Sequence, residues 1–312
     1  MKRKILYLCL GLLLASSVRA QKHTVSGYVR DASNGETLIG ATVLVQGTTN
    51  GTSTNVYGFY SLNLEPGIYD LVFNYLGFGE EIRTVDLTTG NQKLEVELME
   101  EGAELEEVVV LAKKEDQNVT NLQMSVERLD MSTIEKLPTL LGETDVLRSI
   151  QLLPGVTTVG EGAAGFNVRG GSIDQNLVVL DEAPVYNSSH LFGFFSVFNP
   201  DAVKGVQLYK GGIPARYGGR LSSILDVRMR EGNNKQFEMQ GGIGTIFSRL
   251  ALEAPIVKDK SSFLLAGRRS YIDVLAAPFL NDNLSDTKLN FYDLTLKTNY
   301  KFSEKDQVFL SA

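Results

Sequence analysis

Alternating apolar and polar residues dominate the segment from residue 21 to residue 99. In the run Tyr69–Tyr75, positions 69, 71, 73 and 75 are apolar, whereas Asp70 and Asn74 are polar. A period of two is typical of a strand with one buried face. With turn residues between the runs, the pattern predicts an all-β antiparallel sandwich. The expected strands are Thr24–Val29, Ala41–Gln46, Tyr57–Leu64, Tyr69–Tyr75 and Lys93–Leu98.

The pattern from residue 123 to residue 232 is mixed. Two short helices are predicted, Ser132–Leu137 and Glu143–Gln151. Glu143 and Asp145 would lie in the first turn of the second helix, where negative charge suits the helix dipole. Strands joined by glycine-rich loops complete a small α+β domain. These strands are Phe166–Arg169, Leu177–Leu180, Val203–Tyr209 and Ser223–Met229.

Longer two-faced strands begin at residue 233 and continue to residue 312. In the strand from Phe291 to Phe302, apolar side chains such as Leu294 alternate with polar ones such as Asp293 and Lys297. One face suits lipid and the other a water-filled lumen, which predicts the first strands of an antiparallel transmembrane β-barrel. Roughly five such strands are expected, and a closed barrel needs about 8, so the barrel would be incomplete. The alternative, a soluble sandwich, fits the full charges of the polar face less well.

The amino terminus has the pattern of a secretory leader. Three basic residues follow Met1, and an apolar run, Ile5–Ala15, then leads to small residues before Ala20. This predicts a signal peptide over residues 1–20. The only cysteine, Cys9, lies in that leader, so disulfides and thiolate metal sites are not expected in the mature chain. Since no later apolar run reaches the roughly 20 residues of a membrane helix, a membrane-spanning part would have to be a β-barrel.

Charge and candidate chemistry argue against several functional classes. The net charge is −7, and the lysines and arginines are scattered, which disfavours a nucleic-acid partner. The two histidines, His23 and His190, have no H-E-x-x-H spacing, so no metal, no cofactor and no enzyme are expected. Gly160–Gly165 fits G-x-G-x-x-G but precedes a strand pattern, which favours a loop. The adjacent carboxylates Asp181 and Glu182 would point to opposite strand faces, so they are expected to be turn and packing residues.

The first segment resembles a carboxypeptidase regulatory-like domain. The resemblance covers nearly all of residues 21–99, and it implies a transthyretin-like β-sandwich without catalytic residues of its own. The motifs that carry it are Gly40-Ala41-Thr42-Val43, Gly47–Thr52, Gly58–Leu62, Pro66–Tyr69 and Tyr75–Phe78.

The middle segment, residues 123–232, resembles the plug domain of TonB-dependent receptors. Single pieces of the pattern are common, but their order over about a hundred residues is specific. The resemblance implies that Arg169, Arg216 and Arg220 pair with acidic groups in the barrel wall, although simple surface charge stays open for Arg220. Its motif residues are Arg169, Gly170, Arg216, Tyr217, Gly218 and Arg220. The motifs are Leu137-Pro138, Asp145–Arg148, Gln151–Val156, Phe166–Gly170, Leu180–Val185 and Lys210–Arg220.

Residues 100–122 are expected to form a TonB box and a linker. A short apolar run between acidic and polar stretches suits a strand that adds to the edge of a partner's sheet. The alternative is a linker whose valines complete the sandwich. By its position the resemblance assigns the box to Leu105, Glu106, Glu107, Val108, Val109 and Val110.

The complete series resembles a TonB-dependent outer-membrane receptor of the Bacteroidota type. The resemblance implies uptake of a small nutrient, with TonB and the ExbB-ExbD complex as energising partners, outer-membrane lipid around the barrel, and a periplasmic N-terminal domain. Leu111-Ala112-Lys113 in place of Gly-Tyr-Gly favours the siderophore or small-nutrient type over SusC-type glycan importers. The alternative is an exported β-modular adhesin or scaffold without energy coupling.

Overall fold

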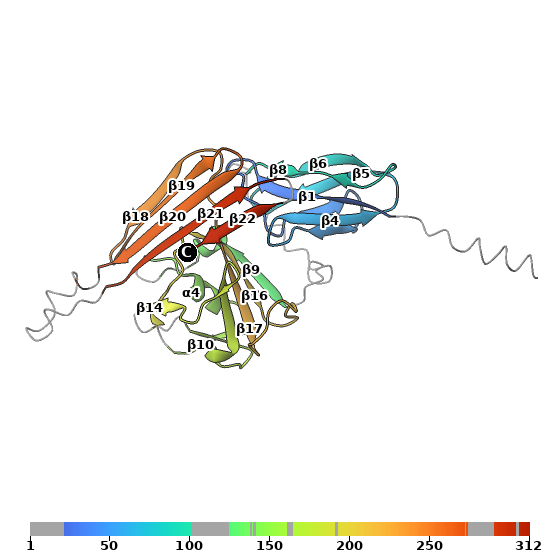
Figure 1. Ribbon diagram of the computed structural model, residues 1–312. Helices are drawn as coiled ribbons and strands as arrows, with labels where there is room; N and C mark the ends of the chain where they lie inside the picture. Colours follow the sequence, from blue (N-terminus) through green and yellow to red (C-terminus); the bar gives the residue numbers. More distant parts are fainter. Residues whose placement is uncertain are drawn as a thin grey trace, which may run out of the picture. The chain divides into compact units, whose positions relative to one another are not determined.

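A computed structural model shows two compact units, Met1–Glu104 and Leu105–Ala312 (Figure 1). The predicted signal peptide and the predicted TonB box, Leu105–Val110, lie outside the described residues. So does most of the predicted box linker. The structure describes residues 22–100, 125–137, 139, 142–160, 165–190, 193–271, 273, 290–303 and 306–312.

The first unit is a sandwich of two four-stranded sheets, which confirms the predicted β-sandwich, although two of its strand pairs are parallel and not antiparallel as predicted. One sheet is built around β1, which pairs antiparallel with β4 and parallel with β7 and β8. Its strands are β1 (His23–Asp31), β4 (Phe59–Leu64), β7 (Gln92–Lys93) and β8 (Val96–Leu98). The other sheet contains, in spatial order, β3 (Gly51–Ser53), β2 (Thr42–Val45), β5 (Ile68–Asn74) and β6 (Glu81–Asp86).

The sandwich core follows the predicted alternation along β5. Leu71 and Phe73 are fully buried, and the ring of Tyr60 meets that of Phe73 edge-on at 5.4 Å. The Tyr60 hydroxyl donates to the Leu94 carbonyl at 2.8 Å, and burial raises the pKa of this phenol. The sequence patterns did not predict β3 or β6. On β6 only Val85 is buried, so its apolar signal is weak.

The second unit begins with a middle domain, residues 125–230, built on a five-stranded sheet. Helices α3 (Met131–Ile134) and α4 (Val146–Gln151) share a hydrophobic core with one face of this sheet. The strands β12 and β17 run parallel, whereas β16 is antiparallel to β17 and to β9. In spatial order the strands are β13 (Ala183–Pro184), β12 (Asn176–Leu180), β17 (Ser223–Met229), β16 (Val203–Tyr209) and β9 (Val126–Asp130).

Two small hairpins complete the middle domain, β10–β11 and β14–β15. The strand β11 follows Gly160–Gly165, so the glycine pattern does not open a helix here. A single 3-10 turn, Ile173–Gln175, precedes β12. The hairpin strands are β10 (Val156–Thr158), β11 (Phe166–Val168), β14 (Ser189–His190) and β15 (Phe195–Ser196).

The predicted start of the second helix was wrong. The helix α4 begins at Val146, and Asp145 precedes it in an extended conformation, with φ −126° and ψ 121°. Its carboxylate accepts hydrogen bonds from the backbone N–H groups of Leu147 and Arg148. An N-cap residue must leave helical geometry to reach these groups. Glu143 therefore lies before the helix rather than in its first turn.

The adjacent carboxylates form the tight turn that the sequence suggests. Asp181 and Glu182 have φ values of 45° and 74°, and Leu180 pairs with Ala183 on either side of them. Positive φ at both central residues is the geometry of a two-residue hairpin turn that matches strand twist.

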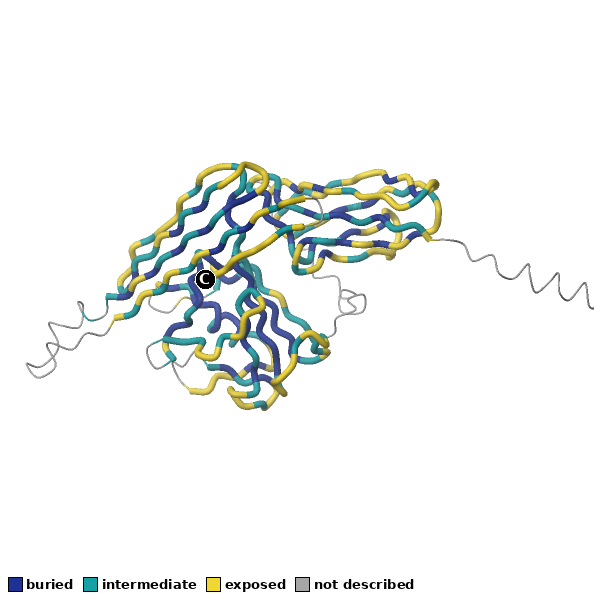
Figure 2. Tube along the Cα trace, viewed as in Figure 1, coloured by how far each residue is buried: buried dark blue, intermediate teal, exposed yellow. Residues whose placement is uncertain are grey.

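The chain then forms a terminal sheet of five antiparallel strands in sequential order, as predicted. Burial alternates along the central strands of this sheet in Figure 2: Leu294 is 70% exposed, whereas Lys297 and Asn299 are buried. The apolar face therefore points outward and the polar face inward, also as predicted. The strands are β18 (Glu238–Ile243), β19 (Phe247–Val257), β20 (Ser261–Ser270), β21 (Tyr292–Lys301) and β22 (Gln307–Ser311).

Glycine is required where the middle domain joins the terminal sheet. Gly232 has a φ of +84°, and a Cβ there would lie 2.5 Å from the carbonyl oxygen of Phe263. A side chain would push the linking segment away from β20. Among the described residues, no helix is long and apolar enough to cross a membrane.

The buried face of β5 gives a test of the sandwich. Replacing fully buried Phe73 with alanine should lower the free energy of unfolding by about 3–5 kcal/mol, because transfer and cavity costs add. Ile82→Ala on neighbouring β6, where the side chain is 45% exposed, is the matched control and should cost much less. Denaturant unfolding of residues 21–100 measures both, and equal losses would contradict this core.

Candidate functional site

The inward face of the terminal sheet carries charged side chains covered by the middle domain. The side chains of Arg268, Glu253 and Lys297 are 1%, 3% and 8% exposed. Removing a charge from water is costly unless a partner of opposite charge and hydrogen bonds replace the solvent. The middle domain supplies these partners, which makes the interface the candidate functional site.

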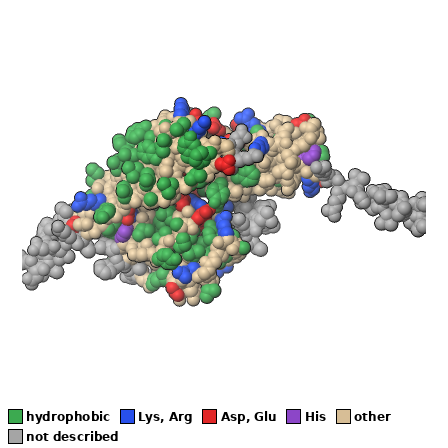
Figure 3. Space-filling model, in the orientation of Figure 1, with side chains coloured by type: hydrophobic (Ala, Val, Ile, Leu, Met, Phe, Trp, Pro, Cys, Tyr) green, Lys and Arg blue, Asp and Glu red, His purple; other side chains and the backbone are tan. Residues whose placement is uncertain are grey.

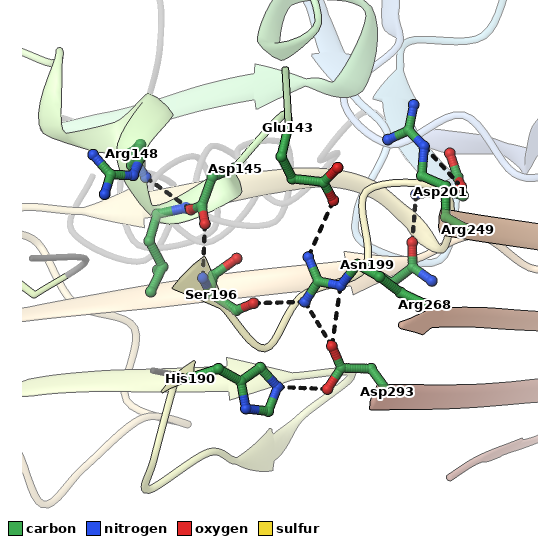
Figure 4. A network of polar contacts seen from close by, with 11 residues as sticks. Glu143, Asp145, Arg148, His190, Ser196, Asn199, Asp201, Arg249, Arg268 and Asp293 are labelled. Carbon is green, nitrogen blue, oxygen red and sulfur yellow. Dashed lines mark hydrogen bonds and ion pairs between the residues drawn. The ribbon is translucent and has the colours of Figure 1, made fainter. Parts of the chain in front are cut away.

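Arg268 on β20 is the centre of this interface (Figure 4). Its Nη1 lies 3.3 Å from Oε1 of Glu143, in the segment before α4. Its Nη2 donates to the backbone carbonyl of Ser196 on β15 at 2.7 Å and to Oδ2 of Asp293 on β21 at 2.6 Å. Nε donates to the same Asp293 oxygen at 3.1 Å. One guanidinium thus joins two segments of the middle domain to two strands.

Aromatic rings surround the Arg268 guanidinium. Its central carbon lies 5.7 Å from the ring centroids of both Phe247 and Phe291. Phe195 of the hairpin packs edge-on against Phe247, with centroids 4.8 Å apart. Such faces attract a cation and exclude water, which strengthens the ion pairs beside them.

His190 on β14 extends the network on the other side of Asp293. Its Nε2 lies 2.5 Å from Oδ1 of Asp293, and its ring stacks on Phe291 with centroids 4.4 Å apart. Asp293 therefore bridges Arg268 and His190, one carboxylate oxygen to each. The stack and the ion pair together hold the β14–β15 hairpin against β21.

Asp145 ties the same hairpin to helix α4. While Oδ1 caps the helix, Oδ2 accepts a hydrogen bond from the backbone N–H of Ser196 at 2.7 Å. Arg148 of α4 donates from Nη2 to the carbonyl of Phe194 at 3.0 Å. The hairpin is thus fixed on one side by α4 and on the other by the terminal sheet.

Further ion pairs continue along the interface. Nε of Arg249 on β19 lies 3.5 Å from Oδ2 of Asp201, and Nη2 of Arg230 lies 2.7 Å from Oε1 of Glu253. Burial raises the pKa of Asp201, against the opposing effect of Arg249 and Arg230. Burial likewise raises the pKa of Glu143, and the charge of Arg268 partly offsets it.

Lys297 on β21 forms a separate anchor. Its Nζ lies 2.8 Å from Oδ2 of Asp181 and donates to the carbonyl of Met229 at 3.0 Å. The Ser311 hydroxyl on β22 donates to the same carboxylate oxygen at 2.9 Å. The positive-φ turn at residues 181 and 182 is thereby fixed to two strands.

The predicted motif arginines make their described contacts inside the middle domain. Arg169, at a φ of 48°, donates from Nη2 to the Ser125 hydroxyl at 3.0 Å. Arg220 donates to the carbonyl of Gly219 at 3.2 Å, and Arg216 lies 4.8 Å from the Tyr217 ring centroid. Their expected pairing with acidic groups of a barrel wall stays a prediction.

The remaining motif residues, Gly170, Tyr217 and Gly218, lie in loops of the middle domain. The Tyr217 hydroxyl donates to Oδ2 of buried Asp226 at 2.6 Å, and this contact together with burial raises the pKa of Tyr217. Gly170 has a φ of 82°, which suits a turn after Arg169. A Cβ at Gly218 would meet open space.

Sequence reasoning missed the residues at the centre of the interface. Arg268, Asp293 and His190 were not proposed as site residues, nor was Glu143. One signal was available, because Arg268 and Asp293 are direct cross-strand partners on the polar faces of two successive strands. Opposite charges at such positions stabilise a strand pair and mark the inward face.

Comparison with known proteins agrees with this architecture. The family model described as TonB-dependent Receptor Plug Domain matches residues 118–223, and that described as CarboxypepD_reg-like domain matches residues 25–110. The chain therefore carries a carboxypeptidase regulatory-like domain followed by a TonB-dependent receptor plug domain. Its middle domain is therefore called the plug below, and its first unit the regulatory-like domain.

Two relatives and one solved structure are named as receptors. The TonB-dependent receptor SusC of Bacteroides thetaiotaomicron is 27% identical over 248 residues, which are 76% of this chain and 24% of that protein. The TonB-dependent receptor P3 of Formosa agariphila is 32% identical over 146 residues, 45% of this chain and 14% of that protein. The siderophore receptor PirA of Acinetobacter baumannii has a TM-score of 0.43 and 18% identity, covering 61% of this chain and 31% of its own. The chain thus spans only about a quarter of SusC.

The role of Arg268 can be tested by substitution. Arg268→Met should weaken docking of the β14–β15 hairpin by about 3–5 kcal/mol, because it leaves buried carboxylates without their partner. Limited chymotrypsin digestion of the full-length receptor should then cut at Phe195, whose side chain is buried in the wild type.

Arg269→Met is the matched control, because this neighbouring side chain is exposed on the other face of β20. If the two variants are cleaved at the same rate, Arg268 does not hold the hairpin.

Proposed function

We propose that this chain forms part of an outer-membrane receptor that binds a small nutrient outside the cell and imports it with energy from TonB. The observation that carries the proposal is the two-sided terminal sheet, apolar on one face and, on the other, charged and covered by a plug. It is proposed to act as a transporter and not as an enzyme.

The outward face of the sheet suits a lipid environment. Large apolar side chains gather over the terminal sheet in Figure 3, and Ile243, Tyr292 and Leu294 are 90%, 78% and 70% exposed. Soluble proteins rarely expose so continuous an apolar surface. Tyr292 begins β21 and Phe302 directly follows its last residue, and aromatic residues at the two ends of a strand are typical of the girdles of a membrane barrel. Acyl chains would cover the apolar side chains of this face.

The inward face explains the need for an energy source. Three ion-paired basic residues, Arg249, Arg268 and Lys297, hold the plug to the strands. Breaking one such buried pair costs several kcal/mol, so ligand binding alone is a weak means of opening the passage. A pull transmitted along the chain supplies that work.

In this proposal the pulling force along the chain reaches the plug at β9. This strand is the edge of the plug sheet and pairs only with β16 among the described strands. The proposed TonB box, Leu105–Val110, precedes β9 in the chain and would add as a strand to TonB, which the ExbB-ExbD complex energises. In this proposal the regulatory-like domain lies in the periplasm.

The ligand proposal stays at the class of a small nutrient. The preference for a siderophore type over a SusC type rests on Leu111–Lys113, which lie outside the described residues. SusC itself is among the relatives. The proposal therefore does not depend on that preference.

Binding of the TonB periplasmic domain to a peptide spanning Glu101 to Lys114 tests the energy coupling. Val109→Pro removes a main-chain donor and should weaken binding by at least about tenfold, whereas Val109→Thr retains the donor and should bind like the wild type. Isothermal titration measures all three peptides. Absence of binding by every peptide, with a known box as positive control, would reject this box and favour an adhesin or scaffold.

A further inference from the structure

The charges between the plug and the terminal sheet do not balance. Among the described residues, each guanidinium of the interface lies within ion-pair distance of a carboxylate, and Asp293 is shared between Arg268 and His190. Four carboxylates thus face three guanidiniums, which leaves one negative charge over when His190 is neutral. The carboxylates are Glu143, Asp201, Glu253 and Asp293, and the guanidiniums are Arg230, Arg249 and Arg268.

The nearby charged groups outside this cluster do not alter that balance. The carboxylate of Asp145 accepts three backbone N–H bonds, two of them at the start of α4. Arg148 on the same helix adds one positive charge, which offsets Asp145. Asp181 is matched by Lys297. The unbalanced charge therefore belongs to the interface around Arg268.

His190 is placed to carry the missing positive charge. Histidine is the side chain whose charge ordinarily changes between about pH 5 and pH 8. Its ring is 25% exposed, so protons reach it, while Nε2 rests on Oδ1 of Asp293. Asp293 on β21 is the charged group in contact with it, and Asp293 also pairs with Arg268 on β20, which in turn pairs with Glu143 before α4. On β15 its neighbour Phe195 is uncharged.

The buried carboxylates act in the same direction. Burial raises the pKa of Glu143 and of Asp201, so both hold a proton more readily when the plug is docked than when they are solvated. A group whose pKa is higher in the docked state stabilises docking at low pH and loses that effect as pH rises. A proton on either carboxylate therefore favours docking, as a proton on His190 would.

We infer that docking of the β14–β15 hairpin on the terminal sheet takes up one proton at His190, which makes the plug–strand interface a pH-sensitive latch. The latch holds more tightly near pH 6 and releases more easily near pH 8, the range in which histidine loses its charge. The inference rests on the proposed function only in its last step, from hairpin release to transport.

Hydrogen exchange of the purified full-length receptor, without TonB, tests the latch. The measured quantity is the protection of backbone amides in peptides covering residues 188–198, corrected for the intrinsic effect of pH on exchange. In the wild type this protection should fall between about pH 6 and pH 8, by up to about tenfold per pH unit for one linked proton.

Two histidine variants separate the latch from a general effect of pH. His190→Gln keeps a side-chain donor for Asp293 but has no titrating ring, so its protection should be nearly constant over that range. His23→Gln changes the histidine of the regulatory-like domain, whose Nδ1 lies 2.5 Å from the Leu87 carbonyl oxygen, and should keep the wild-type profile. A wild-type profile in His190→Gln would overturn the inference.

Glu143→Gln decides the case if His190→Gln simply undocks the hairpin. This variant removes the unbalanced negative charge while Arg268 retains Asp293, so protection near pH 8 should rise to the level that the wild type shows near pH 6. Protection that stays at or below the wild-type level near pH 8 would overturn the inference. Because no TonB is present, a failed TonB-box assay leaves this result intact.

Discussion

The structure depends on one constraint: a sheet whose apolar face is proposed to contact lipid must keep the charges in the middle of its strands on the other face, where each charge needs a partner. Arg268 shows how the constraint is met. Its guanidinium is almost fully buried, and its ligands come from the segment before α4, from β15 and from β21. The sheet without the plug would leave that charge in an apolar lumen wall beside Phe247 and Phe291. Plug and strands are therefore two halves of one electrostatic unit.

The distribution of charge also suits the movement of the plug that the proposed function requires. Basic groups stand mainly on the strands and acidic groups mainly on loops and turns of the plug, as in the pair of Lys297 with Asp181. Ion pairs of this kind give orientation and specificity, although their net stabilisation is modest because desolvation opposes it. The φ of 45° at Asp181 is held by contacts with β21 and β22, so local strain is offset at the interface. Such contacts can break and form again without unfolding the hydrophobic core of the plug.

Much of this fold could be predicted from the sequence, and the residues show why the rest could not. A period of two fixes the face of every residue in a strand, so Leu294 and Lys297 were assigned correctly. The start of α4 was wrong because Asp145 uses its side chain as a cap, which competes with helical geometry. Arg268 was missed because Glu143 lies 125 positions away in the chain. The two-residue strand of His190 is too short to carry a pattern.

The most direct test of this account is the exposure to lipid of adjacent residues on β21. The only cysteine is Cys9 of the predicted leader, so single cysteines at Leu294 and Thr295 can carry an environment-sensitive fluorophore in the receptor. With the receptor in bilayers, quenchers attached to acyl chains should strongly reduce the signal at Leu294 and hardly affect Thr295, because successive strand residues face opposite sides. Equal quenching at both positions, or none at Leu294, would contradict a lipid-facing sheet closed by the plug.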